Sequence, residues 1–149
     1  MNALLTVRGL RKRHGERLLF DIDELTLDAA SAYVLTGANG VGKSTLLRIL
    51  GGLEAAQLDS VSFDGHAFDL QPYPKALRAA IVYVHQHPIM FSTSVWHNIA
   101  YGLLARGESK AVVKKTVEEA MHWAGVEYLA DTEPARLSGG EKQRVALAR

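Results

Sequence analysis

A run of consecutive residues in the first third of the chain has the composition and spacing of a phosphate-binding loop. It fits the pattern G-x-x-x-x-G-K-[ST] and comprises Gly37, Ala38, Asn39, Gly40, Val41, Gly42, Lys43, Ser44 and Thr45. The glycines let the backbone curl so that successive N–H groups point at one phosphate. Lys43 is a compact cation that can reach the β- and γ-phosphates, and the Ser44 hydroxyl suits Mg²⁺ as a ligand. The pattern predicts that the chain binds a nucleotide through its phosphates.

The residues on either side of the loop predict the elements that must position it. Residues 32–36 form an apolar run of strand length directly before the loop. Apolar residues follow at helical spacing, and Gly51-Gly52 is a helix stop. A helix that begins at the loop adds the positive end of its dipole to the phosphate site. The alternative, a glycine-rich turn that merely contains Lys-Ser, does not account for these flanks.

A second motif, L-S-G-G-E, begins at Leu137 and opens the segment 137–149. Ser138 and Glu141 have the spacing of a capping box, which predicts a helix that starts here. Gly139 and Gly140 leave two N–H groups without neighbouring side chains, beside the Ser138 hydroxyl. The segment is therefore either a well-capped helix or, in addition, a clamp for a γ-phosphate.

Residues 137–149 resemble the signature motif of ATP-binding cassette (ABC) ATPases, and with residues 37–45 the chain is identified as a member of that family. The resemblance implies an α/β fold: a P-loop NTPase core with an N-terminal antiparallel β segment and a helical subdomain. It implies ATP and Mg²⁺ as cofactors, with Lys43 as a catalytic residue. It also gives Gln86, after the predicted strand at 81–84, the role of contacting Mg²⁺ and the attacking water. Taken alone, Gln86 is as consistent with a surface loop.

Several positions depart from the family pattern. His14 stands where an aromatic residue usually stacks on adenine, and histidine stacks more weakly and with a pH-dependent charge. Ala38 replaces a common proline, and Ala30 and Asp59 replace usual glycines. The last three affect turns rather than chemistry.

The resemblance covers the whole chain but predicts an incomplete cassette. The family's acidic Mg²⁺ ligand, catalytic glutamate and switch histidine are expected in a segment that follows the signature helix. We expect the chain to be the N-terminal portion of a longer product, lacking the C-terminal half of the core and inactive in hydrolysis by itself. The domain prediction is residues 1–87 for the nucleotide-binding core and β part, 88–138 for the helical subdomain and 138–149 for the start of the signature helix.

Hydrophobic periodicity predicts the remaining strands and helices. Strands are predicted at 4–8, 18–20 and 22–27, with a strand and Asp-Gly turn at 61–65. Helices are predicted at 95–106 and 109–124, ended by Gly107 and Gly125. The second helix carries an apolar stripe made of Val113, Val117, Ala120, Met121 and Ala124.

Composition limits the possible partners. The chain of 149 residues is 48% hydrophobic, has a net charge of +1 and contains no cysteine. These values are typical of a globular protein without disulfides and give no reason to expect binding to nucleic acid. With no secretion signal or membrane span in the sequence, the resemblance implies a cytoplasmic subunit attached to the membrane through a permease.

The predicted function is that of the ATP-binding subunit of an ABC importer for a small solute. Residues 84–103 resemble importers of inorganic oxyanions of the tungstate, molybdate or sulfate type. The implied partners are a second copy of the chain in a nucleotide-sandwich homodimer, permease subunits and, indirectly, a solute-binding protein. An exporter is the main alternative, although residues 131–136 replace the Glu-Arg-Gly usual there. A non-transport cassette protein and an inert fragment remain open, while the signature motif argues against a P-loop kinase or GTPase.

Overall fold

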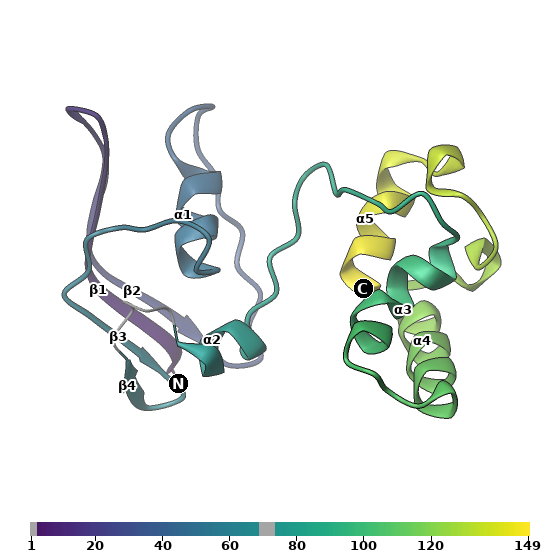
Figure 1. Cartoon of the computed structure of the whole chain (residues 1–149). Coiled ribbons are helices and arrows are strands. Elements are labelled where there is room, and N and C mark those ends of the chain that lie inside the picture. Colours follow the sequence, from purple (N-terminus) through teal and green to yellow (C-terminus); the bar gives the residue numbers. More distant parts are fainter. Residues whose placement is uncertain (1–2, 69–73) are drawn as a thin grey trace. The chain divides into compact units, whose positions relative to one another are not determined.

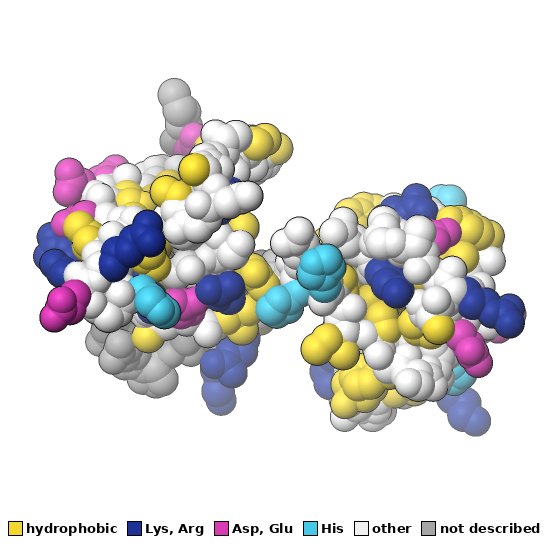
Figure 2. All heavy atoms as spheres, turned by 90° about the horizontal axis from the view of Figure 1, so that it is seen from above, with side chains coloured by type: hydrophobic (Ala, Val, Ile, Leu, Met, Phe, Trp, Pro, Cys, Tyr) yellow, Lys and Arg dark blue, Asp and Glu magenta, His cyan; other side chains and the backbone are white. Residues whose placement is uncertain are grey.

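The computed structural model describes residues 3–68 and 74–149. The chain divides into two compact units, Met1–Tyr83 and Val84–Arg149, which are described separately. Hydrophobic, basic and acidic side chains are intermixed over the face shown in Figure 2.

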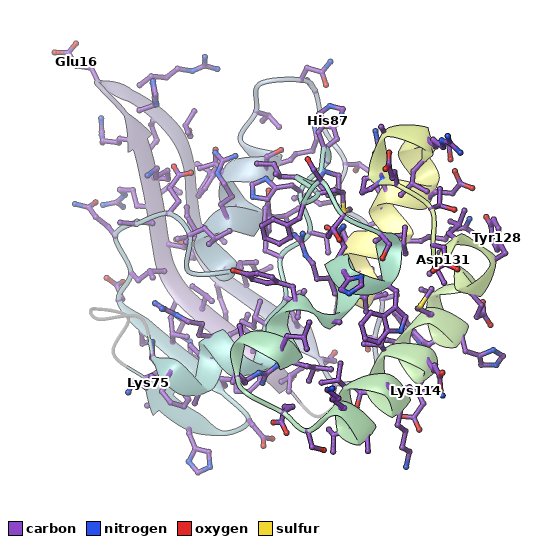
Figure 3. All side chains as sticks on the ribbon, turned by 45° about the vertical axis from the view of Figure 1, so that its right-hand side comes forward. Glu16, Lys75, His87, Lys114, Tyr128 and Asp131 are labelled. Atoms are coloured by element: carbon purple, nitrogen blue, oxygen red, sulfur yellow. The ribbon has the colours of Figure 1, made fainter. Side chains whose placement is uncertain are left out.

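The first unit is built on an antiparallel sheet (Figure 1). Its strands are β1 (Ala3–His14), β2 (Arg17–Asp28), β3 (Ser60–Phe63) and β4 (His66–Phe68), in the order β2-β1-β3-β4. β1 and β2 form one long hairpin with Glu16 at its tip (Figure 3). The predicted strands at 4–8, 18–20 and 22–27 are all parts of this hairpin and are confirmed. The Asp64-Gly65 turn is confirmed too, with φ values of 49° and 76°, as a type I′ turn requires.

Two helices accompany the sheet. Helix α1 (Lys43–Leu50) begins at the predicted loop and ends at Gly51, as expected. Its Leu46 and Ile49 are buried with Leu10 and Val61 of the sheet. The short helix α2 (Lys75–Ala80), which buries Leu77 in the same core, was not predicted, since six residues show too little periodicity.

The strands expected before the phosphate loop and before Gln86 are absent from the described residues. Residues 31–38 and 81–85 have no regular secondary structure, and the side chains of Val34 and Val82 are 88% and 75% exposed. An apolar, β-branched run favours an extended backbone, but a strand exists only where a neighbour pairs with it. Neither segment forms a ladder with the described sheet. The mixed α/β class is confirmed, while these two strand predictions are wrong for this structure.

The second unit is helical. It contains α3 (Val95–Ala105), α4 (Lys110–Ala124) and α5 (Gly139–Ala148), with the 3-10 turns η1 (Glu127–Leu129) and η2 (Pro134–Arg136). Ser94 and Ser109 cap α3 and α4, and Gly125 ends α4 in a left-handed conformation. The predicted apolar stripe is confirmed, since Val113, Val117 and Met121 are buried and Ala120 and Ala124 pack beside them.

The boundary between the units follows Tyr83, four residues before the predicted end of the core, so that Gln86 lies in the helical unit. The predicted division into functional domains remains a prediction.

Candidate phosphate site and signature turn

The loop at residues 37–45 has a backbone that only glycine adopts readily at three places. Gly37, Gly40 and Gly42 have φ values of 146°, 78° and 105°. A Cβ atom on Gly42 would lie 3.0 Å from the ring of Phe20, which projects from β2. Phe20 therefore backs the loop where it enters α1, a contact that sequence reasoning missed because the residues are far apart in the chain.

Lys43 lies inside the curve of its own loop. Its Nζ donates hydrogen bonds to the carbonyl oxygens of Gly37 and Ala38, both at 2.8 Å. Lys43 is also the first residue of α1, where the initial N–H groups have no intrahelical partner. The ammonium and the helix N-terminus thus bring positive charge to one place, the arrangement that a phosphate requires.

The hydroxyls after Lys43 differ in their surroundings. Ser44 is exposed, whereas Thr45 Oγ1 accepts a hydrogen bond of 3.2 Å from Arg48 Nη2. Mg²⁺ prefers oxygen ligands and usually takes only one or two from the protein, with phosphates and water completing its octahedron. An exposed hydroxyl beside the phosphate loop fits that need, so Ser44 would hold the ion.

An ion-pair cluster fixes α1 to the sheet. The Glu54 carboxylate accepts from Lys12 Nζ of β1 and from Arg48 Nη2 of α1, each at 2.9 Å. The hydrogen bond from Lys12, with a second from Arg48, lowers the pKa of the Glu54 carboxyl. The helix that begins at the phosphate loop is thereby held by charge as well as by its buried leucine and isoleucine.

His14, the predicted adenine contact, is the last residue of β1 and is exposed opposite Arg17. It belongs to the same unit as the phosphate loop. Its role toward adenine remains a prediction.

The helical unit brings Gln86 and the signature helix together. The backbone oxygen of Gln86 accepts a hydrogen bond of 3.2 Å from Nε2 of Gln143 on α5. Arg149 Nη1 donates to the Ile89 carbonyl at 2.9 Å, and its guanidinium lies 5.8 Å from the ring centroid of Phe91. Two side chains at the C-terminal end of the chain thus hold the segment that follows Gln86. Sequence reasoning missed both contacts.

The signature turn has the predicted capping box. Ser138 Oγ accepts from the backbone N–H of Glu141 at 3.3 Å, and Glu141 Oε2 accepts from the Ser138 N–H at 2.7 Å. Leu137 is buried and anchors the turn in the core. Cβ atoms built on Gly139 and Gly140 would meet nothing within 4 Å, so both glycine backbones face open space. That space is what a phosphate approaching the helix N-terminus needs.

A further pair of side chains completes the turn. Glu141 Oε1 accepts from the Tyr128 hydroxyl at 3.0 Å, and Arg144 Nη2 donates to the Tyr128 oxygen at 3.2 Å. Hydrogen bonds from the Ser138 side chain and backbone, and then from Tyr128, lower the pKa of the Glu141 carboxyl. The sequence carries no signal for Tyr128, which is separated from Glu141 by η2 and the turn itself.

No helix among residues 3–68 and 74–149 has the length and apolar character needed to cross a bilayer.

Comparison with known proteins places these features in a family. A family model described as ABC transporter matches residues 20–149. The tungstate uptake system ATP-binding protein TupC of Peptoclostridium acidaminophilum is 36% identical over 145 residues, covering 97% of this chain and 65% of that protein. The sulfate/thiosulfate import ATP-binding protein CysA of Bordetella bronchiseptica is 38% identical over 151 residues, covering 97% and 42%. The spermidine/putrescine import ATP-binding protein PotA of Haemophilus influenzae is 30% identical over 146 residues, covering 98% and 39%.

Among solved structures, CbiO1 of Clostridium perfringens, part of the ABC transporter complex CbiONQ, matches with a TM-score of 0.85 at 28% identity. The match covers 99% of this chain and 61% of CbiO1, so the chain spans less than two thirds of each of these proteins. The family model and the fold agree with the loop and turn described above, and the chain belongs to the ABC transporter family.

Proposed function

We propose that this chain supplies the phosphate-binding and signature elements of an ATP-binding subunit that powers an ABC importer. The observation that carries the proposal is Lys43, held at the N-terminus of α1 within a loop whose glycines adopt left-handed conformations. A loop of that form presents N–H groups and one cation to the β- and γ-phosphates of ATP.

The proposed reaction is ATP hydrolysis by the complete protein. Lys43 and the first amides of α1 bind the phosphates and offset the charge that develops on the transferred phosphoryl group. Ser44 would hold Mg²⁺, which would neutralise further charge on the phosphates. For Gln86 the proposal keeps the role implied by the family resemblance: contact with Mg²⁺ and the attacking water, and communication with the permease.

The signature turn acts on the nucleotide of a second copy. Ser138, Gly139 and Gly140 of one copy close over the γ-phosphate bound by the other, which forms a homodimer with two nucleotides at its interface. The open space beside both glycines and the free helix N-terminus support this arrangement. Opening and closing of the dimer then drives permease subunits, at the cytoplasmic face of the membrane, in concert with a solute-binding protein.

The proposed cargo is a small inorganic oxyanion. The tungstate and sulfate/thiosulfate import proteins, at 36% and 38% identity, support it over the spermidine/putrescine protein at 30%. The ATP-binding subunit does not touch the cargo, so the substrate rests on these relatives alone. An exporter or a non-transport cassette protein is the alternative function.

Calorimetry on the purified chain tests the nucleotide proposal. We expect binding of Mg·ATP, weaker binding of Mg·ADP and none of AMP, because the loop contacts the β- and γ-phosphates. Equal affinity for ATP and AMP would contradict a phosphate-directed site. Growth of a deletion strain on limiting molybdate, tungstate or sulfate, with and without the complete gene, tests the cargo.

A further inference from the structure

The hydroxyl of Ser138 already has an acceptor. It donates to Glu141 Oε2 at 2.6 Å, and the backbone N–H of Ser138 donates to the same oxygen at 2.7 Å. A serine hydroxyl has one hydrogen to donate. A phosphate that meets Ser138 must therefore compete with Glu141 for that hydrogen.

The position of Glu141 is in turn set by Tyr128. Its second oxygen, Oε1, accepts from the Tyr128 hydroxyl at 3.0 Å, and Arg144 donates to the Tyr128 oxygen at 3.2 Å. The hydrogen bonds run in one direction, from the guanidinium through the phenol to the carboxylate. Each donor in such a chain polarises the next, which draws negative charge away from the side of the carboxylate that faces Ser138.

The contact depends on the hydroxyl of Tyr128 rather than on packing of its ring. Tyr128 is 68% exposed and projects from the turn that follows α4 (Figure 3). Its neighbour Leu129 is buried in the helical core, so the backbone that carries Tyr128 is fixed. Removal of the hydroxyl alone therefore separates a positioning role from a structural one.

We propose that Tyr128 is a positioning residue of the signature turn: it fixes the Glu141 carboxylate and weakens its hold on the Ser138 hydroxyl, so that the γ-phosphate of a second copy can take that hydrogen. The proposal rests on the nucleotide-sandwich function proposed above and adds a residue to it. Without the phenol, Glu141 keeps its charge but loses an anchor, so the turn is less ordered and repels the phosphate more strongly. Both effects weaken closure of the dimer.

The test uses single hydroxyl deletions in the full chain. Tyr128→Phe removes the anchor, and Tyr101→Phe is the matched control, because the structure shows no hydrogen bond to the hydroxyl of this half-exposed tyrosine among the residues it describes. Glu141→Gln and the double variant complete a double-mutant cycle, which isolates the interaction between Tyr128 and Glu141. Two readouts are needed: titration of the Glu141 side-chain carboxyl by carbon-13 NMR, and Mg·ATP-driven dimerisation by analytical ultracentrifugation.

We expect Tyr128→Phe to raise the pKa of Glu141 toward its ordinary value and to weaken ATP-driven dimerisation about three- to tenfold, the effect of losing one ordinary solvent-exposed hydrogen bond. The groups that the structure places against this carboxylate are Ser138 and Arg144 of the turn and helix and Tyr128 of η1. In the Glu141→Gln background the same deletion is expected to have a smaller effect. Mg·ATP affinity of the isolated chain should not change.

Two results would overturn the proposal. One is a Glu141 pKa that is the same in Tyr128→Phe and Tyr101→Phe; the other is equal dimerisation of these two variants. A wild-type chain that binds Mg·ATP but forms no ATP-dependent dimer would instead overturn the sandwich function itself. The carboxyl titration would still decide in that case whether Tyr128 anchors Glu141.

Discussion

The side-chain amide of Gln143 donates to the backbone carbonyl of Gln86 across a sequence separation of 57 residues. Gln86 is the predicted contact to Mg²⁺ and water, and Gln143 lies on the helix that opens with the signature turn. The bond therefore fixes the backbone of Gln86 to the helix that begins with the proposed signature residues.

Gln143→Leu keeps the size of the side chain and removes this donor. We expect the free energy for local opening of residues 86–89 to fall by about 1 kcal/mol, which corresponds to about fivefold faster amide hydrogen exchange there. Mass spectrometry of exchange in the whole chain measures the effect. Leu147→Gln, at a half-exposed site on the same helix, is the control and should leave these amides unchanged. Equal exchange in wild type and Gln143→Leu would show that the contact has no role in holding the segment.

Lys43→Ala removes the cation of the phosphate loop. Two charge-assisted hydrogen bonds to phosphate oxygens are worth about 3 kcal/mol together, so Mg·ATP affinity should fall at least about 100-fold. Fluorescence titration with an ATP analogue measures it. Lys75→Ala removes an exposed cation at the start of α2 and should bind as wild type does. An unchanged affinity in Lys43→Ala would refute the assignment of the loop.

Ser138→Arg places a long side chain where the phosphate of the second copy would approach. We expect near-normal nucleotide binding, because the phosphate loop is intact, but no ATP-driven dimer. Loss of the Ser138 cap should also cost about 1 kcal/mol of stability. Ser138→Thr keeps a capping hydroxyl and serves as the comparison. Full ATP-driven dimerisation of Ser138→Arg would show that Ser138 acts only as a helix cap.

Asn98 is fully buried and organises the segment before α3. Its amide nitrogen donates to the carbonyls of Phe91, Thr93 and Ser94, and its oxygen accepts from the Phe91 N–H at 2.8 Å. Asn98→Ala removes all four of these bonds and leaves the Phe91 N–H and the Thr93 carbonyl without this partner, so it should destabilise the helical unit by about 2–3 kcal/mol. Asn98→Asp should be at least as harmful, because a carboxylate would face the carbonyls. Urea unfolding followed by tryptophan fluorescence reports on this unit, since both tryptophans, Trp96 and Trp123, lie in it; a midpoint like that of wild type in either variant would contradict this account.

Ala30 has a φ of 53°, a left-handed conformation that costs an L-residue about 1–2 kcal/mol. Ala30→Gly removes that cost, although glycine also raises the entropy of the unfolded chain. The free energy of unfolding should still rise by about 0.5–1 kcal/mol. Ala29→Gly, at the preceding residue with an ordinary φ, should instead destabilise. Calorimetric melting of the two variants distinguishes these signs, and a lower melting temperature for Ala30→Gly would show that the turn is not strained.

The features that were predicted correctly depend on residues close in sequence. The capping box of Ser138 and Glu141, the Asp64-Gly65 turn and the helix stop at Gly125 all form within a few residues, so their chemistry can be read locally. The apolar stripe of α4 follows from helix periodicity.

The features that were missed depend on distant partners. The runs at 32–36 and 81–84 have the composition of strands, but their state depends on whether a neighbour pairs with them. The contacts of Gln143 with Gln86, of Tyr128 with Glu141 and of Phe20 with Gly42 arise only when separate elements pack together. No pattern within a single element encodes them.

The two carbonyl contacts of Lys43 mean that arrival of a phosphate is an exchange of partners. The ammonium gives up neutral oxygens of Gly37 and Ala38 for charged ones, and it starts within the loop where it is needed. Part of the conformational entropy of its flexible four-carbon stem is therefore lost before ATP arrives. We therefore expect the binding of ATP to be driven mainly by enthalpy, with little further loss of conformational entropy from the Lys43 side chain.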